Sequence, residues 1–122
     1  MGLFFKSKPS SGRIPVSKIP KDWDAGFRDG SPLWQKGEEQ RKAGHYEEAI
    51  ALYDQARNRG YLAPALYKSY AMTYRKLKDR DAEIEILTEG IARMQAANGK
   101  IGNFETGIRD LTEQLKKAKQ SK

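Results

Sequence analysis

The feature that most constrains this chain is a helical pattern that repeats every 34 residues. A shift of that length, made without a gap, places Leu33 on Tyr67 and Tyr53 on Leu87. A second shift carries Tyr67 onto Ile101, so the last segment repeats the pattern once more. Apolar residues recur three or four positions apart throughout, and no alternating pattern typical of a strand competes with them. The sequence therefore predicts an all-α fold in which antiparallel helix pairs stack on one another.

Local signals set the expected helix ends. Ser31 followed by Pro32 is a strong start signal, because Ser caps a helix and Pro fits its first position. Gly44 and Gly60 are typical of residues that end a helix in the left-handed conformation. The helices are predicted at about residues 32–43, 46–59, 64–77, 80–97 and 102–119.

Residues 1–30 differ from the rest of the chain. They contain three prolines, at positions 9, 15 and 20, and no helical period that lasts for two turns. We expect a basic arm over 1–30, disordered or extended, before a helical domain over 31–122. Trp23 and Phe27 lie four residues apart, and would either dock this arm onto the domain or form a short helix of their own.

The repeat resembles that of the tetratricopeptide repeat family, which has the same period. Repeat one, about 30–63, has the matching residues Leu33, Gly37, Ala49 and Tyr53, with small residues where paired helices approach closely. Repeat two, about 64–97, keeps Tyr67, Tyr70, Ala71 and Tyr74, but has Lys78 and Glu83 where the family has small residues. The resemblance implies a short right-handed solenoid, closed by the segment 102–119 as a capping helix.

Members of this family usually bind peptides in a concave groove lined by the first helix of each pair. The resemblance therefore implies a non-enzymatic protein-interaction module, an adaptor or assembly factor. The residues of this chain at the groove positions are mostly basic, which favours an acidic peptide or protein as partner. They are Trp34, Arg41, Lys42, Lys68, Met72, Arg75 and Lys76. The alternative interpretation of the same charges is an ordinary solvated helix surface.

The net charge of +7 is concentrated near the two ends of the chain. Six Lys and Arg face three Asp and Glu in residues 1–30, and the same numbers recur in residues 98–122. Two dense basic clusters lie at residues 75–80 and 116–122; the first suits a helix C-terminus and the second a solvated chain end. The alternative function is a basic nucleic-acid-associated protein whose cationic ends contact phosphates.

Composition argues against catalysis. The chain has no Cys and a single His, His45, so we expect no catalytic residues, no metal site and no cofactor. No apolar stretch approaches the ~20 residues that span a bilayer, which predicts a soluble, cytoplasmic protein. Two repeats are fewer than the roughly three that usually bury a continuous core. The chain would compensate as a homodimer, by docking its arm, or through its capping helix.

Overall fold

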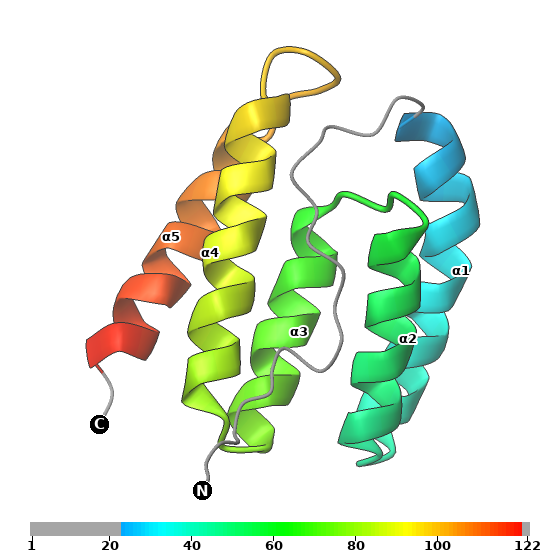
Figure 1. Cartoon of the computed structure of the whole chain (residues 1–122), viewed down its shortest axis with the longest axis vertical. Coiled ribbons are helices and arrows are strands. Elements are labelled where there is room, and N and C mark those ends of the chain that lie inside the picture. Colours follow the sequence, from blue (N-terminus) through cyan, green and yellow to red (C-terminus); the bar gives the residue numbers. More distant parts are fainter. Residues whose placement is uncertain (1–22, 121–122) are drawn as a thin grey trace, which may run out of the picture.

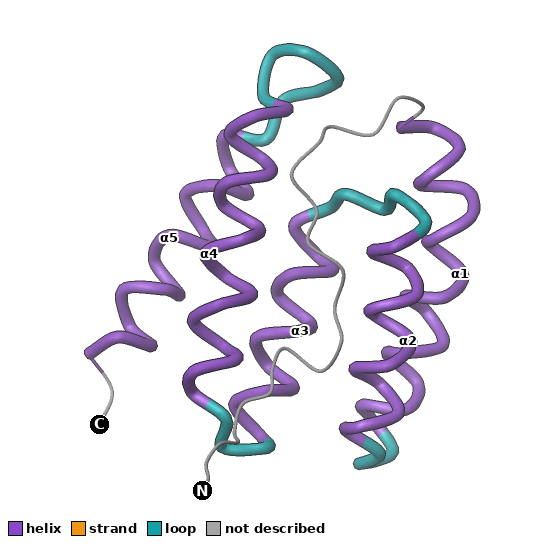
Figure 2. The backbone as a smooth tube through the Cα atoms, viewed as in Figure 1, coloured by secondary structure: helices purple, strands orange, loops and turns teal. Residues whose placement is uncertain are grey.

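The computed structural model describes residues 23–120, and these form five α-helices without a strand (Figures 1 and 2). The predicted all-α class is confirmed. The helices are α1 (Trp23–Lys42), α2 (Tyr46–Asn58), α3 (Pro64–Lys76), α4 (Arg80–Ala97) and α5 (Glu105–Gln120). None of these helices is long and apolar enough to cross a membrane.

Helix α3 lies at the centre of the molecule (Figure 1). Each helix packs against the next one along the chain, and α3 also contacts α1 and α5. The helices α1, α3 and α5 therefore form a row of neighbours, whereas the backbones of α2 and α4 do not approach each other. In Figure 1 the pair α1–α2 lies on one side of α3, and the pair α4–α5 lies on the other.

The predicted start of the first helix at Pro32 is wrong. Helix α1 begins at Trp23 and runs through Pro32 without interruption, so residues 23–30 are helical and not part of an extended arm. The indole N–H of Trp23 donates to the carbonyl of Leu62 over 3.2 Å. The ring of Phe27 packs on those of Trp23 and Tyr61, with centroids 5.9 and 5.7 Å away. These contacts outweigh the lost hydrogen bond that Pro costs inside a helix. The rest of the predicted arm, 1–22, lies outside the described residues.

The last helix also begins at a different residue from the one expected. It starts at Glu105 and not at residue 102, because a loop follows Gly99, whose φ of 81° is left-handed. The side-chain oxygen of Asn98 accepts a hydrogen bond from the backbone N–H of Phe104 over 2.7 Å and closes this loop. Ile101 and Phe104 therefore pack against the core from the loop, although the sequence pattern predicted both among the apolar positions of the last helix.

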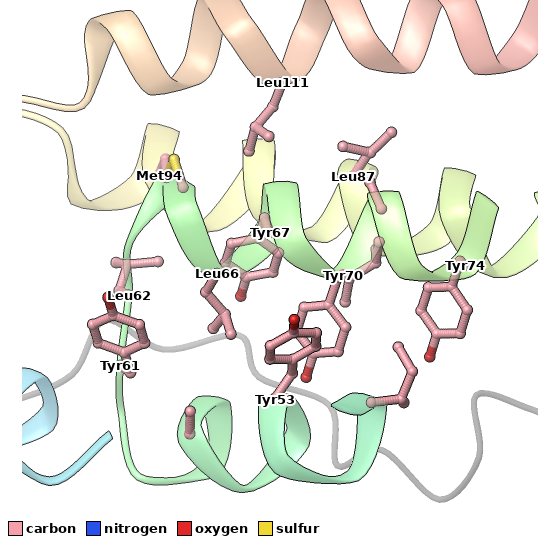
Figure 3. Packing of buried hydrophobic residues seen from close by; sticks show 14 of the residues in the cluster. Tyr53, Tyr61, Leu62, Leu66, Tyr67, Tyr70, Tyr74, Leu87, Met94 and Leu111 are labelled. Carbon is pink, nitrogen blue, oxygen red and sulfur yellow. The ribbon is translucent and has the colours of Figure 1, made fainter. Parts of the chain in front are cut away.

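Tyrosines of α2 and α3 dominate the core (Figure 3). The ring of Tyr70 lies between those of Tyr53 and Tyr67, with centroids 5.4 and 6.0 Å away, and stacks parallel to Tyr74 at 6.2 Å. Gly37 permits the close approach of α1 and α2, because a Cβ there would lie 2.5 Å from the Tyr53 ring. The close helix contact predicted at Gly37 is thus present, and the large side chain of Tyr53 is fully buried.

The turns after α1 and α3 have the same backbone geometry. Gly44 and Lys78, which lie 34 positions apart in the sequence, have φ angles of 88° and 60°. In each turn this residue donates its N–H to a carbonyl three positions earlier over 3.0 Å, and the next residue donates to a carbonyl five positions earlier. This pair of bonds is the Schellman pattern that ends many helices. Helix α2 ends in the same way at Gly60, whose φ is 92°, so this geometry is a shared helix ending and does not by itself reveal the 34-residue period.

Candidate peptide-binding groove

The seven predicted groove residues come from α1 and α3, two helices of the row α1–α3–α5. The contacts of these residues divide the candidate groove into two halves. One half lies between α1 and α3, and the other lies between α3 and α5. The polar side chains of the two halves are satisfied to different degrees.

Trp34 joins α1 to α3 and to the loop before α3. Its indole N–H donates to the hydroxyl of Ser69 over 3.0 Å, and its ring packs on Tyr61 with centroids 6.2 Å apart. Trp34 is half-buried and packs against the core. Trp34 therefore holds α1 against α3, in addition to lying at a predicted groove position.

Arg41 is held by Glu38, one turn earlier on α1. The guanidinium makes a 2.6 Å ion pair with the Glu38 carboxylate, which also accepts a 2.6 Å hydrogen bond from Tyr53. Burial opposes the ionisation of Glu38, but hydrogen bonds from Arg41, Ser69 and Tyr53 outweigh it and lower the pKa of this carboxyl. Arg41 also reaches α3, where Nη1 lies 3.5 Å from the sulfur of Met72. The charge of Arg41 is thus neutralised within the protein.

A pocket of about 410 Å³ opens between α3 and α5, beside the turn that joins α3 to α4. It contains three of the predicted groove residues together with five that the sequence pattern did not predict there. The predicted ones are Lys68, Met72 and Arg75, and the others are Arg80, Glu83, Gln114, Lys117 and Ala118. The pocket therefore combines side chains of three helices, α3, α4 and α5.

Four cations line this pocket against a single carboxylate, Glu83. Arg75 pairs with Glu83 over 2.8 Å, and Glu83 is only 5% exposed. Lys68 pairs with Asp110 of α5 over 3.0 Å. Within residues 23–120, no ion pair involves Arg80 or Lys117, the two remaining cations. Two cations of the pocket thus make no ion pair within the described part of the chain.

The other two predicted groove residues, Lys42 and Lys76, do not line the pocket. Both are exposed, and each is the last residue of its helix, α1 or α3. Cations are favourable at this end of a helix because they face the partial negative charge of the last carbonyls. The structure therefore gives these two lysines a helix-end position, apart from the pocket.

Arg80 and Lys117 were missed because each belongs to a basic cluster that suits a solvated surface. Arg80 closes the cluster at residues 75–80, and Lys117 lies in the cluster at residues 116–122. The structure brings one residue of each cluster to the same pocket. The 34-residue shift did indicate that the final helix is equivalent to α3. It does not show that α5 packs beside α3, and only that packing brings the two clusters together.

A second group of charges is buried between α2, α3 and α4. Arg57 of α2 makes two hydrogen bonds of 2.6 and 2.8 Å with the Glu89 carboxylate of α4. Tyr67 donates to the same carboxylate over 3.0 Å and accepts from Arg93 over 2.7 Å. Burial opposes the charge of Arg57, but Glu89 outweighs it and raises the pKa of the guanidinium. This group joins the helix pairs α1–α2 and α4–α5 through α3.

The described residues contain no group of three or more His, Asp or Glu side chains that could hold a metal ion. His45 is exposed in the turn after α1, and its Nδ1 lies 2.8 Å from the side-chain oxygen of Gln40. The α3–α5 pocket, with four cations and one carboxylate, offers ionic and hydrogen-bonding contacts to a ligand.

The chain matches no protein-family model, no curated protein and no solved structure. The resemblance to tetratricopeptide repeats therefore stays a prediction from the sequence.

Proposed function

We propose that this protein is a non-enzymatic interaction module that binds an acidic segment of a protein partner along the row α1–α3–α5. The observation that carries the proposal is the pocket between α3 and α5, in which four cations face one carboxylate. Carboxylates are the natural ligands of such a site, because Arg and Lys bind them through charge-assisted hydrogen bonds.

The packing of the helices supports this proposal. The helices α1, α3 and α5 contact one another in a row, as the first helices of successive repeats do in a stacked array. A short solenoid, as the family resemblance implies, would present this row as one continuous binding surface. The charge of the pocket then selects the acidic class of partner.

Nuclear magnetic resonance provides a direct test of the proposed surface. We would titrate ¹⁵N-labelled protein with a peptide rich in Glu and Leu, and with a matched peptide in which Gln replaces every Glu. We expect amide shifts on α1, α3 and α5 with the acidic peptide only. Absence of shifts at millimolar peptide, or shifts confined to α2 and α4, would contradict the proposal.

The same titration with single-stranded and double-stranded oligonucleotides tests the alternative from the charge of the chain ends. Binding to phosphates through many Lys and Arg contacts falls steeply with salt. An oligonucleotide that binds more tightly than the acidic peptide at 150 mM salt would replace the proposed function by a nucleic-acid function. An oligonucleotide that shifts no amide at low salt would exclude that alternative.

A further inference from the structure

The two halves of the groove differ in how many charges they leave unpaired. In the α1–α3 half, Trp34 is bonded to Ser69, and Arg41 is paired with Glu38. A ligand would have to break these bonds before it could use either side chain. In the α3–α5 half, Arg80 and Lys117 line the pocket without an ion pair in the described part of the chain. An incoming carboxylate can pair with these two cations at no cost in internal bonds.

The pocket also offers an apolar surface beside these cations. Met72 is 41% exposed and is one of two large hydrophobic side chains that the described residues expose to this extent. Ala118 of α5 adds a second apolar group, and Gln114 adds a neutral hydrogen-bonding side chain. A thioether adapts its shape to different apolar partners, which suits a contact with a peptide side chain. A free phosphate would use the cations but would leave the Met72 surface without a partner.

We infer that the α3–α5 pocket is the specificity site of the groove, and that it recognises a peptide carboxylate next to an apolar side chain. Arg80 and Lys117 hold the carboxylate, and Met72 contacts the apolar residue. This inference rests on the proposed function. It narrows the partner from any acidic segment to one in which a carboxylate stands next to an apolar side chain. Lys68 and Arg75 shape the pocket while they remain paired with Asp110 and Glu83.

Fluorescence anisotropy with a labelled octapeptide that contains Leu-Glu-Glu tests this inference. The test variant is Arg80→Gln with Lys117→Gln. The matched control is Arg59→Gln with Lys100→Gln, which removes the same two charges from exposed positions outside the pocket. We expect about tenfold weaker binding for the test variant, as two charge-assisted contacts imply, and less than a twofold change for the control.

The peptide itself supplies the second part of the test. We expect binding to weaken about tenfold when Gln replaces both Glu residues, and severalfold when Ala replaces Leu. Inorganic phosphate at 10 mM should not displace the peptide at constant ionic strength. Displacement by phosphate, or an unchanged affinity after replacement of Leu, would make the pocket a general anion site and would overturn the inference.

The outcomes separate this inference from the proposed function. If the peptide shifts amides of α1, α3 and α5 but binds the test variant and the control equally well, the pocket assignment is wrong and the interaction module stands. If no acidic peptide binds at all, the proposed function fails as well. Circular dichroism of each variant, compared with the parent chain, verifies that the helices are intact.

Discussion

Arg93 has an unusual environment for a cation. It is 7% exposed, its Nη1 donates to the neutral hydroxyl of Tyr67, and its buried Nε has no hydrogen-bond partner. The nearby carboxylate of Glu89 is already engaged by both bonds from Arg57. In the described part of the chain, Arg93 is therefore a buried cation that makes no ion pair of its own. Burying a cation in this way costs desolvation energy that a hydrogen bond to a neutral hydroxyl does not fully offset.

The buried charges predict opposite results for two substitutions. Arg93→Met keeps the length of the side chain and removes an unpaired N–H, so we expect the free energy of unfolding to stay within about 1 kcal/mol of the parent or to rise. Glu89→Ala leaves Arg57 buried without its counter-charge, and should lower the free energy of unfolding by about 3 kcal/mol. Urea unfolding followed by circular dichroism measures both. Equal losses in the two variants would show that Arg93 is as necessary as Glu89.

At the scale of the element, the starts of α1 and α5 show where sequence patterns fail. The sequence predicted α2, α3 and α4 within a residue or so, because their periods and end signals lie within the elements themselves. The N-terminal half of α1 forms because Trp23 and Phe27 find partners at Tyr61 and Leu62, far away in the sequence. Tertiary packing of this kind overrides a local start signal such as Ser31-Pro32.

The turn that ends α3 contains a side chain in an unfavourable backbone conformation. Lys78 has a φ of 60°, which costs a residue with a Cβ roughly 1 kcal/mol or more. Glycine adopts this conformation without that cost, but loses more entropy on folding. Gly44 occupies the equivalent position in the other turn, and a Cβ there would meet no atom within 4 Å. Both positions therefore require the left-handed backbone conformation, although one holds Lys and the other holds Gly.

This comparison predicts a reciprocal effect. We expect Lys78→Gly to raise the free energy of unfolding by about 0.5–1 kcal/mol, and Gly44→Lys to lower it by about 1 kcal/mol. Both effects arise from the backbone, because neither position is packed against the core. Thermal and urea unfolding of the two variants give the values. The same sign for both substitutions would contradict the equivalence of the two turns.

At the scale of the whole molecule, the sequence predicted the candidate site only in part. Lys68, Met72 and Arg75 were assigned to the groove from α3 alone and do line the pocket. Arg80 and Lys117 were not assigned, because their proximity depends on the packing of α5 beside α3. A residue pattern along one helix can identify one wall of a site. The opposite wall requires the arrangement of the helices.

The tyrosine core makes the stability of the whole fold depend on pH at the alkaline end. Burial, with a smaller effect of the hydrogen bond to Glu38, raises the pKa of Tyr53 to about 12. Burial likewise raises the pKa of Tyr61 and of Tyr67. The same phenols titrate near 10 in an unfolded chain. Because the pKa is higher in the folded state, these groups stabilise the fold fully below about pH 10, and this contribution is lost as the pH rises further.

We therefore expect alkaline unfolding coupled to tyrosine ionisation. At least three of the six tyrosines should resist ionisation until the helices unfold, so tyrosinate absorbance at 295 nm should rise later in the native chain than in 6 M guanidinium. Loss of the helical circular dichroism signal should accompany the delayed part of that rise. Tyr53→Phe should remove one delayed phenol from the titration, since Phe has no proton to lose. If the native and denatured titration curves coincide, the hydroxyls of these tyrosines reach water in the folded protein. That result would contradict the packing that buries Tyr53 and Tyr67 in the core.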